Sequence, residues 1–144
     1  MPAAPSRSRR DWLWPVAWAG AIFLESAQAH VPLPNLPESD KVVHFLAYGL
    51  LATLICRLGR GWKAAVVGAL LASAYGATDE WHQYFVPGRS CDVWDWVADT
   101  AGAMVAVTVY NVWPWYRRML EQGLRPGQGK TNVERPTPDA ERLS

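Results

Sequence analysis

The stretch AAVVGALLASAYGA, residues 64–77, carries no charged side chain on any face of a helix. Residues 42–56 share this property apart from His44. A helix on the surface of a soluble bundle would instead repeat polar residues along its outer face. These two stretches therefore favour helices surrounded by lipid, and a soluble bundle with buried helices is the alternative interpretation.

Apolar stretches of similar character lie at about residues 12–29, 42–58, 62–78 and 93–115. A helix needs roughly 20 apolar residues to cross the hydrocarbon core of a bilayer. We therefore expect an all-α fold, a four-helix transmembrane bundle over residues 11–118. The segments 1–10 and 119–144 are polar, and we expect both to be disordered.

The basic residues predict the orientation of this bundle. Short loops rich in Lys and Arg stay on the cytoplasmic side of a membrane. Such residues gather in the N-terminus, in the turn near residue 60 and at the start of the tail. Both termini are therefore expected to be cytoplasmic. Ala27-Gln28-Ala29 also resembles a signal-peptide cleavage site, and cleavage there would leave three spans.

Several classes of function find no support in the composition. The net charge is +1 and no basic stripe is interleaved with aromatic residues, so nucleic acid is not an expected partner. Cys56 and Cys91 form no metal-binding spacing. No nucleophile motif and no HExxH zinc motif occurs, so the sequence assigns neither a metal nor a cofactor.

Ionisable residues are concentrated at one end of the expected bundle. They are Glu25, His44, Asp79, Glu80, His82, Arg89, Asp92, Asp95 and Asp99. Such residues are costly at membrane depth and usually serve a function or pair with each other. Helical spacing places Asp92, Asp95 and Asp99 on one stripe. A second stripe holds Lys41, His44 and Tyr48, so we expect His44 and Tyr48 to face Asp95 and Asp99.

Val86-Pro87-Gly88-Arg89 predicts a type II turn, because Pro fixes φ and Gly supplies a positive φ. This turn would bring Arg89 over the mouth of the bundle. There we expect Arg89 to pair with Asp79 or Glu80.

Three blocks of residues follow one another in this chain: Asp40-Lys41-x-x-His44-Phe45-x-x-Tyr48, then Tyr75-Gly76-x-x-Asp79-Glu80-x-x-Gln83-x-Phe85-x-Pro87-Gly88-Arg89, then Asp95-x-x-x-Asp99-Thr100-x-Gly102. Together they resemble the VanZ-like family of bacterial membrane proteins. The resemblance implies a four-helix membrane domain in the bacterial cytoplasmic (inner) membrane, multi-pass. The family's namesake is linked to resistance to the glycopeptide teicoplanin. Asp99 stands where the family frequently has Asn, which adds a buried acid.

These expectations combine into an outward-facing acidic pocket that acts on or binds a lipid headgroup or a cell-wall precursor, with membrane lipid as its partner. The candidates for acid–base catalysis are His44, Asp79, Glu80 and Asp95. The candidates for substrate binding are Lys41, Tyr48, Gln83, Arg89 and Asp99. Two alternatives stay open: a non-catalytic scaffold or binding module in which the polar residues form a structural clamp, and a proton path.

Overall fold

The computed structural model describes residues 9–28 and 39–123. These residues form a 3-10 helix and five α-helices: η1 (Arg9–Trp12), α1 (Leu13–Ser26), α2 (Ser39–Cys56), α3 (Gly61–Gln83), α4 (Val93–Val112) and α5 (Pro114–Gly123). The described residues contain no strand, so the all-α class is confirmed. The candidate cleavage site at Ala29, residues 1–8 and the tail from residue 124 lie outside the described residues.

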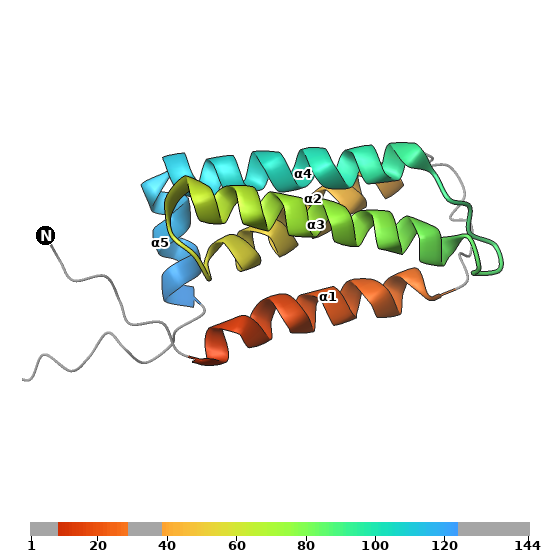
Figure 1. Cartoon of the computed structure of the whole chain (residues 1–144), viewed down its shortest axis with the longest axis horizontal. Helices are drawn as coiled ribbons and strands as arrows, with labels where there is room; N and C mark the ends of the chain where they lie inside the picture. Colours follow the sequence, from red (N-terminus) through yellow and green to blue (C-terminus); the bar gives the residue numbers. More distant parts are fainter. Residues whose placement is uncertain (1–8, 29–38, 124–144) are drawn as a thin grey trace, which may run out of the picture.

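Helices α2, α3 and α4 run side by side and form the body of the molecule (Figure 1). Helix α4 packs most extensively on α2, and α3 packs on both. Helix α1 lies along the outside of this group with a smaller contact, and α5 lies across one end (Figure 1). The opposite end gathers the start of α2, the end of α3 and the start of α4 (Figure 1).

Local chemistry sets the boundaries of α4. Asp92 caps its first turn, because its carboxylate accepts a hydrogen bond from the Trp94 backbone N–H at 2.9 Å. The helix ends at Val112, and Trp113 is extended with φ −109° and ψ 96°. A residue before proline disfavours the helical region, and Pro114 follows. The single helix expected over residues 93–115 is therefore two helices, α4 and α5.

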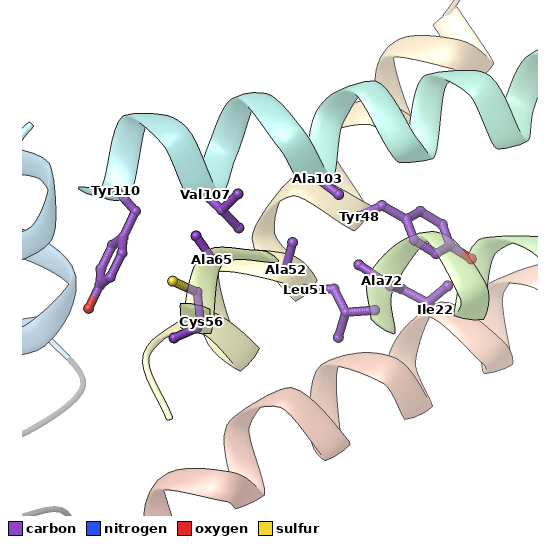
Figure 2. Close-up of a cluster of buried hydrophobic side chains, with 11 residues drawn as sticks. Ile22, Tyr48, Leu51, Ala52, Cys56, Ala65, Ala72, Ala103, Val107 and Tyr110 are labelled. Carbon is purple, nitrogen blue, oxygen red and sulfur yellow. The ribbon is translucent and has the colours of Figure 1, made fainter. Parts of the chain in front are cut away.

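The buried core consists mostly of small side chains. Figure 2 shows Ala52, Ala65, Ala72 and Ala103 distributed between the helices, with Tyr48 beside Ala103 and Tyr110 at the end near α5. Small residues let helix backbones approach closely. A Cβ added at Gly102 would collide with the backbone carbonyl group of Phe45, so α2 and α4 touch here through their main chains.

The larger apolar side chains lie mostly on the outside of the bundle. Leu46, Leu70 and Val93 are each more than 60% exposed. Exposed apolar side chains mark contact with a protein or a membrane where they join into a large patch.

The expected four-helix transmembrane bundle is wrong. Across residues 9–28 and 39–123, no helix combines the length and the apolar content that crossing a bilayer requires. Helix α1 has only 14 residues, α2 opens with Asp40 and Lys41, and α3 is rich in Ala and Gly and ends in charged residues. The prediction counted residues without charge, whereas Ala, Gly and Ser contribute little hydrophobic free energy.

Candidate functional site

Buried carboxylates gather at the end of the molecule where α2 and α4 begin and α3 ends. We call them the acidic cluster: Asp79, Glu80, Asp95 and Asp99. None of the four is more than 5% exposed. The helical periods of α3 and α4 place them on the faces that meet α2, which contributes Lys41 and His44.

Lys41 joins α2 to the start of α4. Its Nζ lies 3.0 Å from Asp92 Oδ2 and 2.9 Å from Asp95 Oδ1. Hydrogen bonds to Asp95 and Asp92 raise the pKa of Lys41, so it remains cationic. Because the Lys41 side chain is 40% exposed, water screens these ion pairs.

Of the expected contacts of His44 and Tyr48 with Asp95 and Asp99, the contact of His44 with Asp99 across α2 and α4 is confirmed, whereas Asp95 bonds to Lys41 instead. His44 Nδ1 lies 2.9 Å from Asp99 Oδ1, and Asp99 is fully buried. Burial lowers the pKa of His44, but the hydrogen bond to Asp99 and the charges of nearby aspartates outweigh it and raise the pKa to about 9. Burial raises the pKa of Asp99, and the hydrogen bond from His44 opposes that shift. His44 thus forms a buried ion pair with Asp99.

Glu80 uses only one of its two carboxylate oxygens. Its Oε2 accepts a hydrogen bond from the Asp92 backbone N–H at 2.8 Å. Its Oε1 is buried without a hydrogen-bond partner among the described residues. Burial raises the pKa of Glu80 to about 7, with added repulsion from Asp95 and Asp99 and an opposing effect of the Asp92 N–H.

Three buried residues complete the site: Asp79, Gln83 and Tyr48. Gln83 Nε2 donates to Asp79 Oδ2 at 3.3 Å, and both residues are buried on α3. The Tyr48 ring stacks on His44 with centroids 6.1 Å apart. Burial, together with the charges of Asp79 and Asp99, raises the pKa of Tyr48, so its hydroxyl stays protonated.

Arg89 lies outside the acidic cluster. The turn before it has the predicted type II form, since Gly88 has φ 82° and the Arg89 N–H bonds to Val86 O at 3.1 Å. The expected pairing of Arg89 with Asp79 or Glu80 is wrong. Its guanidinium instead donates through Nη2 to Glu25 O at 3.3 Å and through Nε to Gln28 O at 3.4 Å. Arg89 therefore holds the end of α1 against the turn.

Sequence reasoning missed Gly76 as a residue that shapes the site. A Cβ at Gly76 would lie 2.6 Å from Asp99 Oδ2 and 3.1 Å from Asp99 Cβ. Because glycine has no side chain, Gly76 leaves room for the Asp99 carboxylate. Gly76 lies three residues before Asp79 on α3, so its helical position was the available signal.

Two sets of side chains bring possible metal ligands together in the described part of the chain. Ligand atoms of His44, Glu80 and Asp99 all lie within 4.8 Å of one another, and all three residues are buried. The second set, Asp40, His44 and Asp95, meets the same distance but is partly exposed at Asp40. The site as a whole offers carboxylates, an imidazole and an ammonium group for acid–base chemistry or for binding a cation.

Comparison with known proteins places the chain in a family. A family profile described as VanZ/LLP1 matches residues 5–114, which is more than half of the 144 residues. No curated protein and no solved structure matches the chain. All three motif blocks, and with them the acidic cluster, lie inside the matched range. This chain belongs to the VanZ/LLP1 family.

Proposed function

We propose that the chain is a membrane-associated protein whose acidic cluster binds the polar headgroup of a lipid or of a lipid-linked cell-wall precursor. The observation that carries this proposal is the excess of buried carboxylates over cations at one end of the bundle. Among residues 9–28 and 39–123, the four acids of the cluster face two cationic side chains, Lys41 and His44.

Electrostatics favour a cationic ligand group at this place. A buried charge that lacks a partner costs several kcal/mol, by order of magnitude. Both Glu80 Oε1 and Asp99 Oδ2 are buried without a hydrogen-bond partner among the described residues. Buried polar atoms in folded proteins normally have one. A headgroup amine, or a metal ion that bridges to a phosphate, would satisfy them.

The surroundings of the cluster favour a ligand with an apolar part. Aromatic side chains on the last turn of α3, the following loop and the first turn of α4 are exposed: Trp81, Tyr84, Phe85, Trp94 and Trp96. Tyr and Trp are enriched at the boundary between lipid and water, where the ring is apolar and the polar atom is hydrated. This end of the molecule thus combines an acidic site with a border suited to a membrane surface.

Liposome binding tests the proposal. We expect the purified chain to co-sediment with phosphatidylcholine liposomes that contain phosphatidylethanolamine, and Asp95→Asn to weaken this binding about tenfold, as for a lost charge-assisted hydrogen bond. Glu121→Gln is the matched control, because Glu121 bonds to Tyr110 at the opposite end of the molecule. Equal binding by wild type and Asp95→Asn would reject the proposal.

A structural clamp is the second candidate, and the bridge from Lys41 to Asp92 and Asp95 favours it. A clamp requires that loss of the bridge lower the free energy of unfolding without changing ligand binding. The proposed function requires that ligand binding weaken while the free energy of unfolding stays unchanged. Urea unfolding and liposome binding of the same variant therefore separate the clamp from the binding function.

A role in glycopeptide resistance belongs to the proposal only if the ligand is a cell-wall precursor. Expression of the chain in a susceptible bacterium would then raise the inhibitory concentration of teicoplanin. Asp95→Asn would abolish that rise, whereas Glu121→Gln would not.

A further inference from the structure

We propose that His44, Glu80 and Asp99 hold a divalent transition-metal ion, Zn²⁺ or Mn²⁺. Each ligand comes from a different helix: His44 from α2, Glu80 from α3 and Asp99 from α4. Their ligand atoms lie within 4.8 Å of one another. Metal–ligand bonds of about 2.1 Å in a tetrahedral site place ligand atoms about 3.4 Å apart, so these side chains need to close by up to about 1.4 Å.

The buried oxygens of the site are an independent reason to expect an ion. Glu80 is 4% exposed and Asp99 is fully buried, yet Oε1 of Glu80 and Oδ2 of Asp99 have no partner among the described residues. A buried acceptor without a donor is rare and calls for an explanation, for example an ion. The two unpartnered atoms belong to two of the three proposed ligands.

A supporting shell already holds the ligands in place. The Asp92 backbone N–H fixes Glu80 Oε2 at 2.8 Å. His44 Nε2 lies 3.9 Å from Asp40 Oδ1, an ion-pair distance that is too long for a hydrogen bond. Gly76 leaves the space that Asp99 fills. Outer contacts of this kind fix the orientation of ligating imidazole and carboxylate groups.

The ligand set decides which ions fit. One imidazole nitrogen and two carboxylate oxygens suit Zn²⁺ and Mn²⁺, whereas Mg²⁺ and Ca²⁺ prefer oxygen ligands alone. A charge of +2 would neutralise both carboxylates. The ion would also displace the proton of the hydrogen bond between His44 and Asp99, and this proton would pass to the solvent when the ion binds.

Three protein ligands leave at least one coordination position open. A phosphate oxygen of a headgroup could occupy it, which explains how an acidic site receives an anionic ligand. This role rests on the proposed function, whereas the ion site itself requires no lipid.

Metal titration of the full chain, after removal of metal with a chelator, tests the ion site without lipid. We expect one Zn²⁺ per chain by calorimetry, competition by Mn²⁺ and no effect of Mg²⁺ in equal amount. Glu80→Gln should weaken Zn²⁺ binding at least tenfold, and Glu121→Gln should leave it unchanged. Circular dichroism establishes that each variant is folded.

Spectroscopy of the wild-type chain keeps the test independent of any variant. Co²⁺ substitution should give visible absorption typical of mixed nitrogen and oxygen ligands, and X-ray absorption of the Zn²⁺ form should show one imidazole. Failure of Zn²⁺ to bind, or equal binding by Glu80→Gln, overturns the ion site. Liposome binding that persists in the presence of a chelator would support the proposed function and show that the ion plays no part in it.

Discussion

The contact between α2 and α4 has two unlike parts. At its polar part, long side chains bridge the helices: Lys41 reaches Asp95, and His44 reaches Asp99. One turn farther along, Gly102 lies against the Phe45 backbone with no side chain between them. The glycine contact fixes the distance between the helices, and the polar residues act across that fixed distance. Stability and ligand binding should therefore respond to different substitutions.

The largest effect on folding is expected at Gly102. In Gly102→Ala the new Cβ would collide with the Phe45 carbonyl, which belongs to the main chain and cannot rotate away. We expect the free energy of unfolding to fall by about 3 kcal/mol, the upper range for overpacking. Urea unfolding measures it. Gly20→Ala is the matched control, since nothing lies within 4 Å of its Cβ and Ala favours helix.

Glu80→Gln should separate binding from folding. The amide matches the volume of the carboxylate, keeps an acceptor for the Asp92 N–H and adds a donor. We expect the metal-free protein to unfold within about 1 kcal/mol of wild type, while Zn²⁺ affinity falls at least tenfold. A large loss of stability in this variant would assign Glu80 to the clamp instead.

Gly76→Ala tests whether close packing also shapes the polar part. The added methyl group would push the Asp99 carboxylate away, with a cost of about 1–2 kcal/mol to folding. Zn²⁺ affinity should fall as well, because a ligand displaced by a few tenths of an ångström no longer fits the ion. Calorimetry and urea unfolding of the same sample measure both. Unchanged Zn²⁺ affinity would contradict the placement of Asp99 among the ligands.

The smallest effect is expected for Lys41→Met. The Lys41 side chain is 40% exposed, and ion pairs with such exposure contribute less than about 1 kcal/mol to the free energy of unfolding. The small dependence of wild-type stability on salt should decrease in the variant, because screening then acts on fewer pairs. Thermal unfolding at low and high NaCl checks this. A loss comparable to that of Gly102→Ala would make the Lys41 bridge the main link between α2 and α4.

Local patterns in the sequence predicted part of this site. Helical spacing gave the pairing of His44 with Asp99, and Pro87 with Gly88 gave the turn. The spans were wrong because residues without charge were counted as if all were strongly apolar. The partner of Arg89 was wrong because it depends on where α1 lies, which no local pattern specifies.

The bonds of Arg89 end on main-chain oxygens, at Glu25 and at Gln28. Every amino acid supplies such an oxygen, so replacement of either side chain should not break this attachment. We therefore expect substitutions at these two positions to leave α1 in its place. A shorter or uncharged residue at Arg89 itself would lose both bonds, and α1 would then be held by the bonds of Trp18 to Ala47 O and of Tyr75 to Ala19 O.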